Sequence, residues 1–81
     1  MPDDEQLRIE AQRAAYWCRW YADQRGISLD ALAVYSGVGR TSIMEMANRA
    51  PSLRTLSSIA KYLGIQVRDL LQDMPDEPKK D

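Results

Sequence analysis

The sequence has no histidine, no phenylalanine and a single cysteine among its 81 residues. Without histidine, Ser-His-Asp and Cys-His catalytic sites and His-containing zinc sites are excluded. The chain also lacks a glycine-rich loop of the kind that holds phosphate groups. Cys18 cannot form an internal disulfide, and a lone cysteine is typically a small residue of the core. We therefore expect no enzyme activity, no metal ion, no cofactor and no small-molecule substrate.

Long hydrophobic runs are absent as well. No apolar segment approaches the ~18 residues that span a membrane, so we expect no membrane contact. Residues 1–5 carry three acids, unlike the basic start of a signal peptide, and we expect a cytoplasmic location. Glycine and proline number four each and lie between periodic segments, whereas helix-forming residues are frequent. These features favour one small all-α domain.

Basic charge is concentrated in the middle of the chain, although the net charge is −1. Residues 37–68 carry five cations and one acid, which gives +4. Residues 1–36 have four cations and six acids (−2), and residues 69–81 have two cations and five acids (−3). A local basic patch is what a protein needs to meet phosphate groups, whatever its total charge.

Capping residues and apolar spacing divide the sequence into five helices. A long first helix begins at Asp3 or Asp4 and ends before Gly26, and Ser28 and Ser52 are good N-terminal caps for two later helices. Residues 1–72 form the domain, and residues 73–81, with two prolines and mostly charges, are expected to form a disordered tail. The helices are expected at about residues 3–25, 28–37, 40–47, 52–64 and 67–71.

Three of these helices show an apolar face, which predicts how they pack. The first helix repeats apolar residues at spacings of four and three, and the fourth at three, three, one and three. In the third helix, Ile43 and Met46 are expected to point inward. The core face of the first helix is Leu7, Ala11, Ala14, Cys18 and Tyr21. The core face of the fourth helix is Leu53, Leu56, Ile59, Ala60 and Leu63.

Two short helices joined by Gly37-Val38-Gly39 indicate a helix-turn-helix at about residues 28–47. The surrounding pattern is Ile27-Ser28, Leu32-Ala33, Gly37-Val38, Ile43, Pro51-Ser52-Leu53, Leu56, Ile59-Ala60, Leu63-Gly64-Ile65 and Leu70-Leu71. Over about residues 14–72 it closely resembles the Cro/C1-type (XRE) helix-turn-helix family. The resemblance implies a five-helix, lambda-repressor-like bundle whose third helix enters the major groove of double-stranded DNA.

The resemblance also implies which residues contact DNA. In such domains polar residues near the start of the third helix contact base edges. Arginine can bind guanine in bidentate fashion, and glutamate can accept a hydrogen bond from cytosine. Other positions lie near the phosphate backbone. Each residue alone also fits a solvated surface or a helix cap, and that interpretation stays open. The implied base-contacting residues are Arg40, Thr41, Ser42 and Glu45, and those near phosphate are Ser28, Leu29, Asn48, Arg49 and Arg54.

The sequence departs from the family pattern at several positions. Leu29 stands where the family has glutamine, and Gly39 stands where serine or threonine caps the third helix. Ala22 and Ala47 replace an arginine and a glutamate that pair in the family. Replacing both charges together avoids a stranded buried charge. We therefore expect the two alanines to face each other in a dry core.

The first helix begins well before the family's first helix. Its outer face carries Ile9, Tyr16 and Trp20, with Trp17 to one side. Tryptophan and tyrosine are enriched at interfaces, so this face is predicted to bind a second copy of the chain or a partner protein. The alternative is that the residues after Leu71 fold back over these rings.

Three functions follow from these features. The first is a sequence-specific DNA-binding transcriptional regulator of a bacterium, phage or mobile element, which occupies an operator as a dimer. The second is a helix-turn-helix domain that binds protein, with weak or no DNA binding; Leu29, the aromatic face and the acidic total charge favour it. The third is a DNA-binding module without strong sequence preference. Steep weakening by salt distinguishes phosphate-driven binding from an apolar protein interface.

Overall fold

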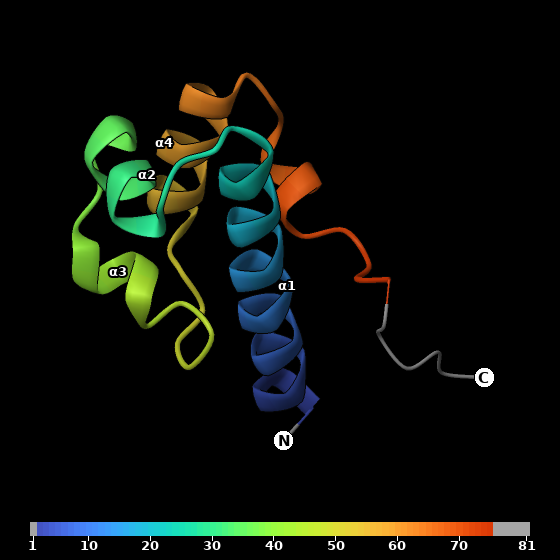
Figure 1. Ribbon diagram of the computed structural model, residues 1–81. Coiled ribbons are helices and arrows are strands. Elements are labelled where there is room, and N and C mark those ends of the chain that lie inside the picture. Colours follow the sequence, from blue (N-terminus) through green and yellow to red (C-terminus); the bar gives the residue numbers. More distant parts are fainter. Residues whose placement is uncertain (1, 76–81) are drawn as a thin grey trace.

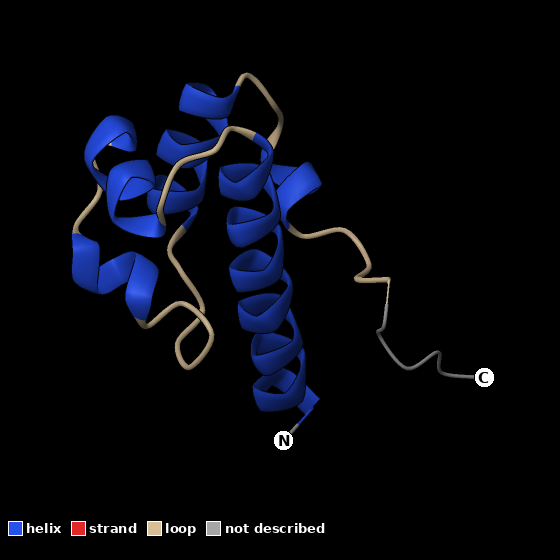
Figure 2. Ribbon diagram, viewed as in Figure 1, coloured by secondary structure: helices blue, strands red, loops and turns tan. Residues whose placement is uncertain are grey.

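The computed structural model describes residues 2–75, which form four α-helices and one 3₁₀ helix (Figure 1). No strand occurs within these residues, so the all-α prediction is confirmed (Figure 2). None of the helices in this range is long and apolar enough to cross a membrane. Most of the predicted tail, residues 76–81, lies outside the described residues. The elements are α1 (Pro2–Gln24), α2 (Leu29–Ser36), α3 (Arg40–Met44), α4 (Leu53–Leu63) and η1 (Val67–Leu70).

The expected fifth α-helix is instead a 3₁₀ helix of four residues, η1. A capping box holds its N-terminal end. The backbone N–H of Gln66 donates to the Asp69 carboxylate, and the Gln66 side chain accepts from the backbone N–H of Asp69. So short a segment favours 3₁₀ bonds, which link residues three apart. Leu70 is nevertheless fully buried, so η1 still packs in the core as expected.

Short-range signals position α2 as the sequence predicts. The Ser28 hydroxyl accepts a hydrogen bond from the backbone N–H of Ala31 (3.0 Å) and caps the N-terminus of the helix. At the other end Gly37 has φ +76°, a left-handed conformation that few other residues adopt. Its N–H donates to the carbonyls of Ala33 and Val34, which closes the helix and starts the turn toward α3.

The core lies where α1, α2, α4 and η1 meet, and α3 is attached through α2. The buried residues include most of the predicted core positions, and the five largest that are almost wholly enclosed are Leu32, Met46, Ile59, Leu70 and Cys18. Cys18 and Met46 are in contact through their sulfur atoms, 3.6 Å apart. This contact connects the middle of α1 to the chain just after α3.

Two predicted core residues are exposed instead. Leu7 is 50% exposed because the N-terminal turns of α1 extend beyond the rest of the bundle (Figure 1). Leu53 is 69% exposed because it is the first residue of α4, and that helix reaches the core only at Leu56. Tyr21 is half-buried and packs against the core from the side.

The expected alanine pair is also wrong. Ala22 is buried as predicted, but Ala47 is exposed, so the two do not share a dry core. The physical reason is that α3 ends at Met44, three residues earlier than expected, and the chain then turns. The turn brings Met46 into the core and leaves Ala47 at the surface.

Candidate nucleic-acid interface

Three of the four predicted base-contacting residues and one predicted phosphate-contacting residue line one hollow of about 320 Å³. Thr41, Ser42 and Glu45 line one side, and Arg49 lines it from the loop. Glu45 ends α3, and its carbonyl accepts hydrogen bonds from the N–H groups of Asn48 and Arg49, both at 2.9 Å. That tight turn brings Arg49, the fourth residue after Glu45, back beside α3.

The start of α4 closes the same hollow. Ser52 and Thr55 line it, and their hydroxyl groups are hydrogen-bonded to each other at 3.1 Å. The Ser52 hydroxyl also accepts from the backbone N–H of Thr55 at 3.2 Å, which caps α4. Two helices therefore present hydroxyl groups, and the loop a guanidinium, to one concave surface.

Arg40, the first residue of α3, points toward α2 rather than into this hollow. Its Nε and Nη2 atoms donate to the two carboxylate oxygens of Asp30, each at 3.2 Å. The side chains remain 69% and 46% exposed, respectively. Arg40 is therefore held at the edge of the helix-turn-helix, between α2 and α3.

The start of α2 lines a second hollow of about 270 Å³. Ser28 is exposed there, whereas Leu29 is half-buried and packs against the core. Leu29 therefore anchors the first turn of α2, which explains how an apolar residue fits where the family has glutamine. The exposed side chain of Met44 and the carboxylates of Asp23 and Asp30 line the same hollow.

The loop after α3 meets the extended N-terminal part of α1. Asn48 and Arg49 line a third hollow, of about 450 Å³, together with Leu7 and Arg8 of α1. Arg8 and Arg49 thus line the same hollow, although they are far apart in the sequence. Arg54 is exposed in the first turn of α4 and lines none of the three hollows described here.

The aromatic residues of α1 form a chain of ring contacts rather than a separate stripe. Trp17 meets Tyr16 edge to face (4.9 Å between ring centroids) and Trp20 at 5.5 Å. Trp20 in turn meets Tyr21 at 4.9 Å, again edge to face. Ile9, Tyr16 and Trp17 are half-buried, and Trp20 is 40% exposed.

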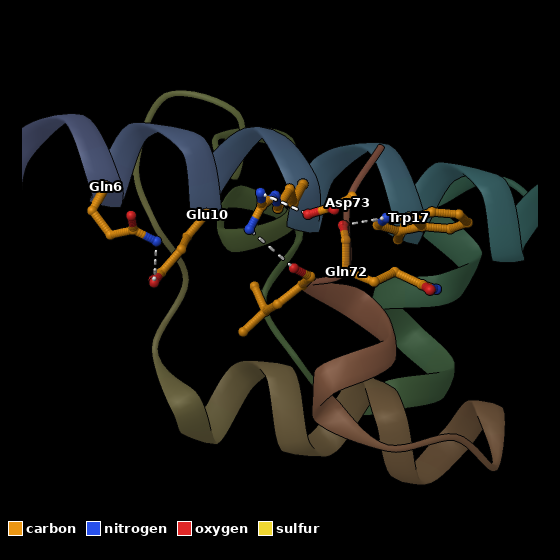
Figure 3. Close-up of polar contacts among 7 residues, drawn as sticks. Gln6, Glu10, Trp17, Gln72 and Asp73 are labelled. Carbon is orange, nitrogen blue, oxygen red and sulfur yellow. Dashed lines mark hydrogen bonds and ion pairs between the residues drawn. The ribbon is translucent and has the colours of Figure 1, made fainter. Parts of the chain in front are cut away.

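Residues 71–73 lie against α1 beside these rings (Figure 3). The indole N–H of Trp17 donates to the carbonyl of Gln72 at 3.0 Å, and Arg13 pairs with Asp73 at 2.9 Å. The chain after η1 thus covers part of the aromatic face, which was one of the two alternatives. In Figure 1 it lies on the side of α1 opposite the helix-turn-helix.

Several residues around the candidate nucleic-acid interface were not predicted from the sequence. Asp30 contacts Arg40 across ten residues and two helices, so no helical periodicity relates them. Arg8 and Thr55 approach the loop only through the packing of α1 and α4. Ser52 carried a signal as a helix cap, but a cap does not reveal which side chains gather beside it.

One pKa that is clearly shifted from its ordinary value belongs to a buried group. Burial raises the pKa of the Cys18 thiol to about 12, so the thiol is neutral at physiological pH. A neutral, enclosed thiol is a poor nucleophile. Cys18 is therefore a core residue, as the sequence predicts.

Comparison with known proteins adds one match. The family model for the Cro/C1-type HTH DNA-binding domain matches residues 20–76, more than two thirds of the chain. Searches of curated proteins and of solved structures gave no match. The matched region covers α2, the turn at Gly37, α3 and α4, the elements that form the surface described above. The chain belongs to the Cro/C1-type helix-turn-helix family of DNA-binding domains, whose members act in transcription regulation.

Proposed function

We propose that the chain is a sequence-specific regulator of transcription, of bacterial, phage or mobile-element type, which occupies an operator and has no enzyme activity. The observation that carries this proposal is the surface shared by α3, the loop after it and the start of α4. Hydroxyl groups, one carboxylate and one guanidinium gather there, and these are the groups that read base edges and hold phosphates.

The roles of individual residues follow from their positions. Arg40 and Glu45 project from either end of α3, where they reach guanine and cytosine respectively, and Thr41 and Ser42 lie between them. Phosphates are contacted by residues at the edges of this surface. Those residues are Ser28, Asn48, Arg49 and Arg54, with the backbone N–H of Leu29.

The decisive experiment is selection of bound duplexes from random DNA, followed by titration of two variants on the selected duplex. Arg40→Ala should relax one base position and weaken binding by ~1–3 kcal/mol. Arg49→Ala should instead weaken all sequences alike and reduce the salt slope by about one. If selection recovers no common sequence, operator recognition is wrong. If both variants bind as the wild type does, the assigned surface is wrong.

The proposal includes a dimer formed through the aromatic face of α1. Trp20 keeps 40% of its surface exposed even with its ring partners in place. A self-complementary contact there would set two recognition helices ~34 Å apart, one turn of DNA. Sedimentation should show a dimer for the wild type and a monomer for Trp20→Ala. Tyr35→Ala, which removes an exposed aromatic residue of α2, is the control that should leave the dimer intact.

A second candidate function is binding of a partner protein by the helix-turn-helix. Val34, Tyr35 and Met44 of the helix-turn-helix and Leu53 of α4 are each more than half exposed, and large exposed apolar side chains are typical of protein-binding surfaces. Binding through them would weaken little with salt, whereas binding to DNA weakens steeply. The salt series in the DNA titration therefore separates the two functions.

A further inference from the structure

The contact between Asp30 and Arg40 has a geometry that bears on base recognition. The carboxylate of Asp30 accepts hydrogen bonds from Nε and Nη2 of Arg40, which lie along one side of the guanidinium. A guanidinium has five N–H groups, so three remain available, including the pair at the end of the group. That pair is the one that binds O6 and N7 of guanine in bidentate fashion. Asp30 and a guanine can thus bind Arg40 at the same time.

We propose that Asp30 is a specificity-determining residue that positions Arg40 for guanine. The inference rests on the proposed function. An unpaired arginine in the major groove has many rotamers and must lose that freedom when it binds a base. The two hydrogen bonds to Asp30 fix the plane of the guanidinium before DNA arrives, so less freedom is lost on binding.

The location of Asp30 adds a second contribution to specificity. Asp30 lies in the first turn of α2, next to Ser28 and Leu29, the residues assigned to the phosphate backbone. A carboxylate at that place repels phosphates on every sequence. On a duplex with guanine at the right position, the contact that Asp30 orients between Arg40 and the base outweighs this repulsion. Asp30 therefore lowers the affinity for all DNA but increases the difference between correct and incorrect sequences.

The pair is suited to this role because it contributes little to the stability of the fold. Both side chains are largely exposed, and exposed ion pairs stabilise proteins only slightly. Its loss should therefore leave the structure intact, and circular dichroism of each variant checks this. Changes in DNA binding can then be attributed to recognition and not to unfolding.

The test compares the selected duplex with one in which the guanine read by Arg40 is replaced by adenine. The ratio of the two affinities measures discrimination, expected at about ten-fold or more for the wild type. Asp30→Asn and Asp30→Ala should reduce this ratio about five-fold while binding unrelated DNA more tightly. Asp23→Asn removes the same charge from the same hollow, but Asp23 does not hold Arg40, so it should keep the ratio.

A double-mutant cycle completes the test. With Arg40→Ala already present, Asp30→Asn should have no further effect on the ratio, because the residue it positions is gone. A wild type without any sequence preference would overturn the proposed function itself. A wild type that discriminates, with Asp30 variants that discriminate equally well, would overturn only the role of Asp30. So would tighter binding of the selected duplex alone, which would make Asp30 a mere competitor for Arg40.

Discussion

The helices α3 and α4 follow one another in the chain but are held in different ways. Helix α4 has eleven residues, a serine cap at one end, a left-handed glycine at the other and four buried side chains. Helix α3 has five residues, one buried side chain and, at Gly39, a cap without a side-chain hydrogen bond. Isolated helices as short as α3 are unstable in water. Helix α3 therefore depends on tertiary contacts for its limits, whereas the limits of α4 are set by caps in its own sequence.

The contacts that hold α3 lie at its C-terminal end. Ile43 is buried, and Met46, just past the helix, is enclosed in the core against Cys18. The N-terminal end, which carries Arg40, is exposed. This arrangement leaves the end that we propose to contact bases exposed while the other end is anchored. The comparison with α4 can be tested by weakening each support in turn.

The largest effect is expected from removing the anchor of α3. Met46→Ala leaves a cavity where a fully buried side chain was, and should lower the free energy of unfolding by about 3 kcal/mol. Met44→Ala is the matched control, because Met44 is 56% exposed and its loss should change stability by less than about 0.5 kcal/mol. Urea denaturation measures both. Equal destabilisation by the two variants would show that the anchor lies elsewhere.

The thiol that contacts this anchor predicts a dependence on alkaline pH. Burial raises the pKa of Cys18 from 9.0 to about 12 in the folded chain. Above pH 9 the unfolded chain loses the thiol proton while the folded chain keeps it, so stability should fall as pH rises between 9 and 12. The loss is about 1.4 kcal/mol per pH unit within this window, and none is expected below it.

The control for this titration is Cys18→Ala, which lacks the thiol but keeps every other titrating group. Its stability should fall less steeply than that of the wild type over the same range. The difference between the two curves isolates the contribution of Cys18. Parallel curves would mean that the thiol is hydrated in the folded chain and that water reaches the core where Cys18 contacts Met46.

The supports of α4 are expected to be individually weaker. Ser52→Ala removes the hydroxyl that accepts from the backbone N–H of Thr55, and should cost about 1 kcal/mol of unfolding free energy. Ser57→Ala changes the same residue type on the exposed side of the helix interior, where alanine is the better helix former, and should stabilise by up to about 0.5 kcal/mol. Opposite signs are the expected result. An unchanged stability of Ser52→Ala would show that Ser52 does not act as a cap.

The same contrast explains what could be predicted from the sequence. Ser28, Gly37, Ser52 and Gly64 act on neighbouring residues, so the limits of α2 and α4 follow from short-range rules and were confirmed. The end of α3 depends on whether Met46 or Ala47 enters the core, and this is decided by packing against α1.

The candidate DNA-contacting residues divide along the same line. Residues such as Thr41 and Arg49 could be assigned from the sequence, because the resemblance to the family relates positions along the chain. Their neighbours Asp30, Arg8 and Thr55 come from other helices, so their approach follows from the tertiary arrangement. Likewise Arg25, next to the end of α1, donates from Nη2 to the carbonyl of Leu63 at 2.6 Å and so caps the C-terminal end of α4. Helical periodicity does not predict this contact, because the two residues are 38 positions apart.

The smallest expected effect comes from supplying α3 with the cap it lacks. Gly39 has φ −71° and ψ 144°, an extended conformation that any residue adopts without strain. A Cβ added there would meet only the Ser42 hydroxyl oxygen at 3.8 Å, an ordinary contact. Gly39→Ser should therefore stabilise the fold by about 0.5 kcal/mol, from a new cap and a less flexible unfolded chain.

Gly39→Ala separates the two contributions, because alanine restricts the unfolded chain equally but cannot cap a helix. The serine variant should exceed the alanine variant by about 1 kcal/mol in unfolding free energy. Hydrogen exchange at the first N–H groups of α3 should slow only in the serine variant, since only the hydroxyl can accept from them. If serine and alanine gave the same stability and the same exchange, the weakness of α3 would not lie at its N-terminal cap. Its dependence on the anchor at Met46 would then be the whole difference from α4.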